Sequence, residues 1–385
     1  MREHLDDVHI ALLCRQPVTD AHWFEKADDV QPELFAIEPQ ESFIRRLRRV
    51  LTVLMGIGYD RKTKQVLQCF KASDALVFCG GGSPGGYGIG NLILHAICPA
   101  ILAGRAKLPT CFLAHGIPVY QSVAQRLLHA ALFKRAALVT VRDPLSMREL
   151  EKMNTQAVCK QTADWAWLLK AAPTNEVEDL LSKEGIQDSG RIRIGMNIRS
   201  GSAVDADARA GTLGEKAGSQ KLAKTMSLLI EQLNAELVIV SMNQAPASDD
   251  LSYARQVCAQ VDDAYRAHVH LLEGDYSPSQ IKGVVAMSDL FIGTRLHPSI
   301  FAISSAVPTI TLHQQAKVVG MMQMTNLEQW HIPVEEFEPT GLVHMVKKLH
   351  LSRDRVLKEQ NMTVDEMQRA ALANVKVFSQ SIKPR

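Results

Sequence analysis

The chain has 385 residues, which corresponds to about two or three domains of ordinary size. With 46% hydrophobic and 22% charged residues, its composition is that of a folded globular protein and excludes a disordered or collagen-like chain. The 43 Lys and Arg residues nearly balance the 41 Asp and Glu residues. We therefore expect no broad basic surface for nucleic acid, and a dedicated DNA-binding protein is disfavoured.

The seven cysteines are scattered and include no CxxC pair, so they predict neither a disulfide framework nor a zinc cluster. Several of them lie in apolar runs, as reduced thiols of a cytoplasmic protein do. The first residues lack the apolar segment of a signal peptide, and no apolar run reaches the ~18 residues of a membrane-spanning helix. The sequence therefore predicts a cytoplasmic protein.

Short runs rich in Val, Ile and Leu alternate along the chain with longer segments of helical period, which is typical of parallel βαβ units. The predicted strands are residues 8–13, 74–79, 110–114, 137–141, 157–160, 192–198, 237–241, 268–271, 290–293 and 309–312. The predicted helices are residues 41–54, 60–72, 91–104, 119–134, 143–153, 217–234, 249–262, 277–287, 297–305 and 340–380. The predicted fold class is α/β.

A polar, turn-rich stretch at residues 171–191 divides this series in two and is interpreted as a connection between domains. We expect an N-terminal domain at 1–170, a C-terminal domain at 192–340 and a C-terminal helical segment at 341–385. Open α/β sheets bind ligands at the carboxyl ends of their strands, so functional residues are sought directly after each strand.

A glycine-rich loop follows the predicted strand at 74–79. Gly80, Gly81 and Gly82 carry no side chains, so a ligand can approach the backbone N–H groups, and a helix begins shortly afterwards. This favours a site for an anion or a sugar. The spacing matches neither the GxGxxG pattern nor the P-loop, and a tight crossover turn is the alternative.

The strand at 290–293 runs into Thr-Arg-Leu-His-Pro and then a helix. Pro298 suits a first helical turn, which places Arg295 and His297 at a helix N-terminus and at the carboxyl end of a strand. Such a site suits a phosphate or a carboxylate, and a histidine can also donate a proton. The alternative is structural, with Arg295 in an interdomain ion pair and His297 as a helix cap.

Two carboxylates of the first half and two cations of the second half also follow predicted strands. Asp143 either acts at the site or caps the helix that begins at Pro144, and Asp164 leaves the same two alternatives open. Arg199 lies at the end of the strand at 192–198, where a guanidinium can bind phosphate or carboxylate in a bidentate fork. Lys317 follows the strand at 309–312 and would add a second cation.

The segment around residues 43–54 predicts a basic amphipathic helix, with apolar residues at 43, 47, 50, 51 and 54 and four arginines between them. We expect its apolar face to pack on the core and its arginines to be solvated. Docking on a membrane surface is the alternative.

Taken in order, these elements resemble the polysaccharide pyruvyl transferase family. The matching elements are residues 74–82, 141–146, 163–164, 195–199, 289–297 with its Arg-Leu-His ending, the strand start at 307–308, and Lys317. The resemblance implies two Rossmann-like domains of GT-B type. It also implies transfer of a pyruvyl group from phosphoenolpyruvate to two hydroxyls of a glycan sugar, which gives a cyclic ketal and releases phosphate.

The resemblance implies that Arg295 and His297 are donor-site residues and that Arg199 and Lys317 are anion ligands. His297 would be the general acid, Asp143 or Asp164 would accept a hydroxyl proton, and the loop at 80–90 would face the acceptor, a free glycan or a lipid-linked oligosaccharide. We expect no metal and no organic cofactor.

The family usually opens with a strand and a glycine-containing loop, whereas this chain begins close to what resembles the following helix and second strand. We therefore expect the N-terminal domain to lack its first βα unit. A GT-B glycosyltransferase that uses a nucleotide sugar and a non-catalytic glycan-binding relative are the alternative functions.

Overall fold

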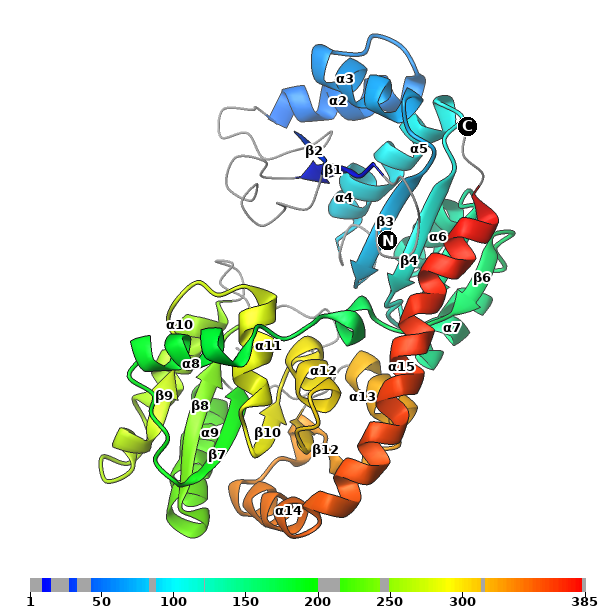
Figure 1. Cartoon of the computed structure of the whole chain (residues 1–385). Coiled ribbons are helices and arrows are strands. Elements are labelled where there is room, and N and C mark those ends of the chain that lie inside the picture. The colour runs from blue at the N-terminus through cyan, green and yellow to red at the C-terminus, as the bar shows by residue number, and fades with distance from the viewer. Residues whose placement is uncertain are drawn as a thin grey trace. The chain divides into compact units, whose positions relative to one another are not determined.

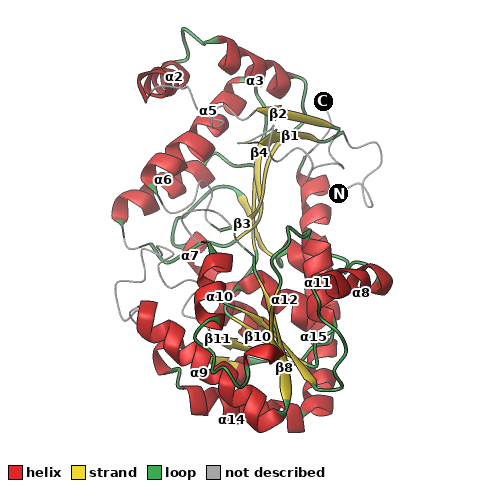
Figure 2. Cartoon of the chain, turned by 90° about the vertical axis from the view of Figure 1, so that its left-hand side faces the viewer, coloured by secondary structure: helices red, strands yellow, loops and turns green. Residues whose placement is uncertain are grey.

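The computed structural model describes residues 9–14, 28–32, 43–82, 88–120, 122–199, 215–242, 249–312 and 316–382. The chain forms two compact units (Figure 1): unit 1 comprises Met1–Asp164 and Ala370–Arg385, and unit 2 comprises Trp165–Arg369. Each unit contains a parallel sheet with helices beside it (Figure 2), which confirms the predicted α/β class.

The main sheet of unit 1 has four parallel strands joined by helical crossovers. Its elements are β3 (Leu76–Gly81), α4 (Ile89–Leu92), the π-helix η2 (Ile93–Ile97), α5 (Cys98–Arg105), β4 (Thr110–His115), α6 (Val123–Phe133), β5 (Leu138–Val141), α7 (Pro144–Glu151) and β6 (Val158–Gln161). The strand order is β3-β4-β5-β6, and β4 and β5 are buried along their whole length. Helices cover both faces of such a sheet, so its strands are buried on both sides and are apolar along most of their length.

The N-terminal part of unit 1 holds a second, smaller sheet. Strands β1 (Ala11–Cys14) and β2 (Asp29–Pro32) pair with each other in parallel, and in the described residues they join no strand of the main sheet. Helices α2 (Phe43–Met55) and α3 (Arg61–Lys71) follow, close to the predicted bounds. Asp60 caps α3, with its carboxylate accepting the Thr63 N–H at 2.8 Å.

The sheet of unit 2 has six parallel strands in the order β9-β8-β7-β10-β11-β12. Its elements are β7 (Ile192–Asn197), α9 (Glu215–Leu233), β8 (Ala235–Val240), α10 (Asp250–Cys258), the 3-10 helix η4 (Arg266–His268), β9 (Val269–Leu271), α11 (Pro278–Ala286), β10 (Leu290–Gly293), α12 (Leu296–Ser304), β11 (Thr309–Leu312), α13 (Ala316–Met324), the 3-10 helix η5 (Glu328–Trp330) and β12 (His331–Ile332). Numbered along the chain this order is 3-2-1-4-5-6, that of a doubly wound fold. The strand order reverses between β7 and β10, which is where such folds bind ligands.

The stretch expected to connect two domains belongs to unit 2. The 3-10 helix η3 (Trp165–Leu168) opens this unit, and helix α8 (Thr174–Lys183) lies inside residues 171–191. Val177, Leu180 and Leu181 of α8 are buried in one core cluster with residues of α11. A Cβ at Gly283 of α11 would lie 2.4 Å from Val177, so the absent side chain allows α8 to approach closely. The stretch is mostly polar, so its short apolar face was not recognised in the sequence.

The predicted C-terminal helical segment consists of the 3-10 helix η6 (Val334–Glu336), helix α14 (Pro339–Leu351) and helix α15 (Arg353–Ser381). The last part of α15 belongs to unit 1. Buried Asn374 accepts hydrogen bonds from the hydroxyls of Thr140 and Thr162 and donates to the Ala163 carbonyl at 3.1 Å. These contacts at the ends of β5 and β6 attach the C-terminal residues to the first unit.

Candidate functional site

The candidate site is the carboxyl edge of the unit 2 sheet, where the strand order reverses. Asn197 at the end of β7 lies opposite Gly293 at the end of β10, and Gly293 lies opposite Thr311 of β11. Arg199 comes two residues after β7, and Arg295 comes two residues after β10. The register therefore brings Arg199 and Arg295, both predicted to bind the substrate, to neighbouring strand ends.

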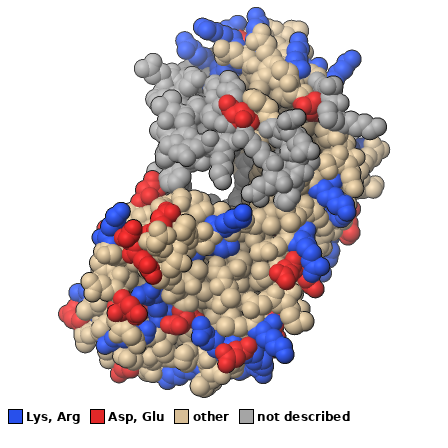
Figure 3. All heavy atoms as spheres, in the orientation of Figure 1, with Lys and Arg blue, Asp and Glu red and all other residues tan. Residues whose placement is uncertain are grey.

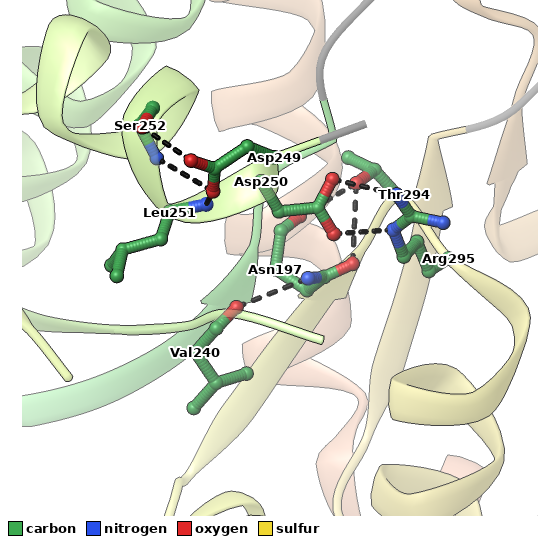
Figure 4. A network of polar contacts seen from close by, with 8 residues as sticks. All are labelled: Asn197, Val240, Asp249, Asp250, Leu251, Ser252, Thr294 and Arg295. Atoms are coloured by element: carbon green, nitrogen blue, oxygen red, sulfur yellow. Dashed lines mark hydrogen bonds and ion pairs between the residues drawn. The ribbon is translucent and has the colours of Figure 1, made fainter. Parts of the chain in front are cut away.

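A bidentate ion pair fixes Arg295 (Figure 4). Its Nε and Nη2 atoms lie 2.5 and 2.6 Å from the two carboxylate oxygens of Asp250. The Asp250 side chain is 0% exposed and that of Arg295 is 21% exposed, so a fully buried carboxylate holds a partly accessible guanidinium. The sequence left open an ion pair of Arg295 across two domains. The pair with Asp250 instead joins two residues of unit 2.

Asn197 and Thr294 form hydrogen bonds that connect the carboxyl ends of β7, β8 and β10. The Thr294 hydroxyl donates to the Asn197 carbonyl at 2.8 Å and lies 3.3 Å from its side-chain oxygen, and the Asn197 amide donates to the Val240 carbonyl of β8 at 3.0 Å (Figure 4). Asn197 is fully buried. Three adjacent strands are thus cross-linked at their carboxyl ends, which gives the arginine-bearing loops a rigid base.

His297 is the second residue of α12 and is half-buried. Pro298 lies in the first turn, as predicted, and the Ser299 hydroxyl donates to the Arg295 carbonyl at 2.8 Å. A Cβ at Gly293 would lie 2.1 Å from the Ser299 hydroxyl oxygen, so glycine is needed where β10 enters this turn. The sequence thus builds a strand, a tight turn and a helix that presents His297 in its positive N-terminal turn.

Lys317 is the second residue of α13 and is half-buried. The stretch between β11 and α13, residues 313–315, lies outside the described residues. Because β11 pairs with β10, Lys317 follows the next strand end along the same edge of the sheet. Arg199, Arg295, His297 and Lys317 are therefore all placed where the sequence predicted, at the ends of β7, β10 and β11.

In unit 1, Asp164 is paired with a buried arginine. Its carboxylate lies 2.6 Å from Nη1 of Arg142, and the two side chains are 9% and 4% exposed. Gly116 makes room for the guanidinium, because a Cβ there would lie 2.7 Å from Nη2. Asp164 therefore neutralises a buried cation, a role that we had not considered for it.

Asp143 has the geometry of a helix cap. Its two carboxylate oxygens accept the backbone N–H and the hydroxyl of Ser146 at 2.7 and 2.8 Å at the start of α7. Burial raises the pKa of Asp143 above its ordinary value, although both hydrogen bonds from Ser146 oppose this shift. Of the two predicted roles the structure displays the cap, with both oxygens occupied and the side chain buried.

The glycine turn ends β3. Gly80 and Gly81 have φ values of +44° and +93°, in the left-handed region that favours glycine, so the turn itself accounts for these two glycines. The Gly81 carbonyl accepts the Gly116 N–H at 3.0 Å. Residues 83–87 of the predicted loop at 80–90 lie outside the described residues, and helix α4 already begins at Ile89, inside that loop. That the turn faces an acceptor sugar stays a prediction.

His115, at the end of β4, lies beneath this turn and was not predicted. Its ring nitrogens face the carbonyls of Gly82 and Phe78 at 3.0 and 3.2 Å. Complete burial lowers the pKa of His115 to about 4, despite both carbonyls, so the ring is neutral at neutral pH. A neutral ring donates to one of the two carbonyls only.

Asp250, Asn197 and His115 are the residues at the two sheet edges that sequence reasoning missed. Two of them had a weak signal: Asp250 is the second of two adjacent carboxylates after a predicted strand, and Asn197 interrupts a buried apolar strand. Among the described side chains no cluster of three His, Cys, Asp or Glu residues is arranged to hold a metal ion. The described helices include none that is long and apolar enough to cross a membrane.

The chain is similar in sequence to a protein of polysaccharide biosynthesis. The chain is 20% identical to the amylovoran biosynthesis protein AmsJ of Erwinia amylovora over 368 residues, which cover 89% of this chain and 85% of that protein.

Several solved structures share the fold. HepE of Anabaena, crystallised with UDP and glucose, is 12% identical and superimposes with a TM-score of 0.57, covering 92% of this chain and 85% of that one. The UDP-GlcNAc 2-epimerase of Neisseria meningitidis bound to UDP-GlcNAc is 14% identical, with a TM-score of 0.58 and the same coverage. These likenesses confirm the two Rossmann-like units of GT-B type.

The family resemblance is established over most of the sequence. Residues 3–313 match the polysaccharide pyruvyl transferase family, a range that contains β7, β10, Arg199, Arg295 and His297. The chain therefore belongs to the polysaccharide pyruvyl transferase family, whose members are transferases of polysaccharide biosynthesis.

Proposed function

We propose that this protein transfers the pyruvyl group of phosphoenolpyruvate to two hydroxyls of a sugar in a polysaccharide or its precursor, forming a cyclic ketal. The observation that carries the proposal is the register of β7 and β10, which brings Arg199 and Arg295 to neighbouring strand ends at the switch point of unit 2. Family membership supports the reaction class. An anionic donor is the ligand that such a site suits.

The donor is held by charge and by hydrogen bonds in this proposal. Phosphoenolpyruvate carries a phosphate and a carboxylate, and the cations Arg199, Arg295 and Lys317 offset their charge. The N-terminal turn of α12 adds a favourable dipole for an anion. Asp250 acts as a positioning residue, because its two hydrogen bonds hold the guanidinium of Arg295 in one orientation.

His297 is the general acid in the proposed reaction. It donates a proton to the methylene carbon of the donor, which becomes a methyl group and leaves positive charge on the adjacent carbon. One sugar hydroxyl adds to that carbon, and the carbon–oxygen bond to phosphate breaks as the second hydroxyl closes the ketal. Of the two hydroxyl protons released, one returns to His297 and one leaves with phosphate. General acid catalysis of this kind contributes about 10²–10⁴-fold in rate.

Phosphate release from phosphoenolpyruvate, measured with a panel of free and lipid-linked glycans, tests the proposal. Glycan-dependent release that His297→Ala abolishes and His344→Ala preserves would support it, since His344 is exposed on α14. Circular dichroism checks that both variants fold. Release of nucleoside diphosphate from a nucleotide sugar in place of phosphate would instead support the glycosyltransferase alternative, and glycan binding without turnover would support the non-catalytic one.

A further inference from the structure

Helix α2 exposes its apolar face. Ile44, Leu47, Leu51 and Leu54 are 75%, 47%, 47% and 46% exposed, and their spacing of three and four residues aligns them along one side of the helix. The stripe continues past the helix end through Ile57, which is 65% exposed. The sequence predicted that the apolar face packs on the core. Val50 of that face does pack beside Val53 and Cys98, but Leu47, Leu51 and Leu54 face outward.

The opposite side of α2 is fixed to unit 1, so the orientation has a structural cause. Val53 is fully buried beside Cys98 of α5, and Arg49 is only 7% exposed, with its Nε donating to the Asp60 carboxylate at 2.8 Å. Arg105 of α5 donates to the carbonyls of Val53 and Leu54, the latter at 2.8 Å. These contacts hold α2 by the side that carries Arg49 and Val53 and leave Leu47, Leu51 and Leu54 facing outward.

Helices α2 and α3 and the turn between them are strongly basic. Residues 43–71 contain eight Lys and Arg and a single acidic residue, Asp60, which is paired with Arg49. Arg45 and Arg48 lie next to the stripe and are exposed, as are Arg61 and Lys64 at the start of α3. Figure 3 shows Lys and Arg side chains around the part of unit 1 that α2 and α3 form.

We propose that α2 docks on an anionic membrane surface, with Ile44, Leu47, Leu51 and Leu54 inserted at the level of the lipid headgroups and the arginines bound to lipid phosphates. An exposed apolar stripe flanked by basic residues is the pattern of a helix that lies in the membrane interface. The local charge favours anionic lipid. It disfavours a second copy of the chain, because a symmetric contact would bring the same arginines against one another. This inference does not depend on the proposed reaction.

Vesicle flotation tests the proposal with the full-length chain. We expect binding to vesicles of phosphatidylglycerol and phosphatidylcholine, weaker binding at high salt, and little binding to phosphatidylcholine alone. Replacing Leu47 and Leu51 by Asp should lower the bound-to-free ratio by about tenfold or more. Replacing Arg45 and Arg48 by Glu should lower it similarly and reduce its salt dependence.

The control is a double variant, Leu351→Asp with Met362→Asp, which changes two exposed apolar residues of unit 2, on α14 and α15, and should leave flotation unchanged. All these side chains are exposed, so thermal unfolding should show that each variant keeps its fold. The proposal is overturned if the wild type does not bind anionic vesicles, or if variants with Leu47 and Leu51 replaced by Asp bind them as strongly as the wild type. It is also overturned if those variants instead dissociate a dimer in light scattering, which would make a second copy the partner.

Discussion

Asp250 and Arg295 form an ion pair in which the carboxylate has no exposed surface and the guanidinium does. Removing a carboxylate from water is costly unless a cation and hydrogen bonds replace the water, and Arg295 supplies both with two of its five N–H donors. The pair therefore sets where the guanidinium lies before any ligand arrives. In the proposed reaction this preorganisation places Arg295 for the donor.

Asp250→Asn tests whether Asp250 positions Arg295 for the donor. The amide keeps the size of the carboxylate but loses its charge and one acceptor atom, so Arg295 is held less firmly and we expect the KM for phosphoenolpyruvate to rise more than kcat falls. The free energy of unfolding should fall by about 1–3 kcal/mol, less than for a fully buried pair because Arg295 is partly solvated.

The matched control is Asp249→Asn. Asp249 caps α10 by accepting the N–H groups of Leu251 and Ser252, and asparagine caps helices nearly as well. We expect it to leave KM and stability close to wild type in steady-state kinetics and urea unfolding. Equal effects of the two variants would contradict a specific role for Asp250.

Gly116→Ala should destabilise unit 1. The new Cβ would lie 2.7–3.0 Å from the Arg142 guanidinium, which is buried against Asp164 and has little room to shift. We expect a loss of about 1–3 kcal/mol in chemical unfolding. Gly104→Ala is the control: a Cβ there meets nothing within 4 Å and the residue is helical, so stability should stay the same or rise by about 0.5 kcal/mol.

His115 should make stability fall in mild acid. The pKa of His115 is about 4 in the folded protein and about 6.5 in the unfolded chain, so between these values only the unfolded chain binds the proton. Stability is then lost as pH falls from about 6.5 towards 4, by about 2 kcal/mol at pH 5. We expect the difference in unfolding free energy between pH 7 and pH 5 to shrink by this amount in His115→Gln. An unchanged difference would show that burial does not control this histidine.

The strand-to-helix elements of unit 2 could be predicted because local chemistry determines them. The apolar run of β10, followed by Gly293, Arg295 and Pro298, indicates a buried strand, a tight turn and a helix start, and the structure confirms all three. The same logic gave a helix cap as one of the two roles left open for Asp143, and that role depends only on residues next to it in the chain.

Features that depend on tertiary contacts could not be predicted in the same way. The sequence of α2 shows that the helix is amphipathic, but Arg105 and Cys98, about fifty residues later, decide which side faces the protein. The sequence of helix α8 predicted a linker. Gly283, about a hundred residues later, allows α8 to pack closely on α11, and this contact cannot be read from the α8 sequence. The partner of Arg295, Asp250, is likewise separated from it by 45 positions.

Binding of phosphoenolpyruvate by isothermal titration calorimetry tests the central claim most directly. We expect saturable binding to the wild type that is lost in Arg295→Ala and in Arg199→Ala. It should be retained in Arg193→Ala, because Arg193 lies near the amino end of β7, at the opposite edge of the sheet. A wild type that binds no phosphoenolpyruvate, or that binds it equally well without Arg199 and Arg295, would contradict a donor site at this edge.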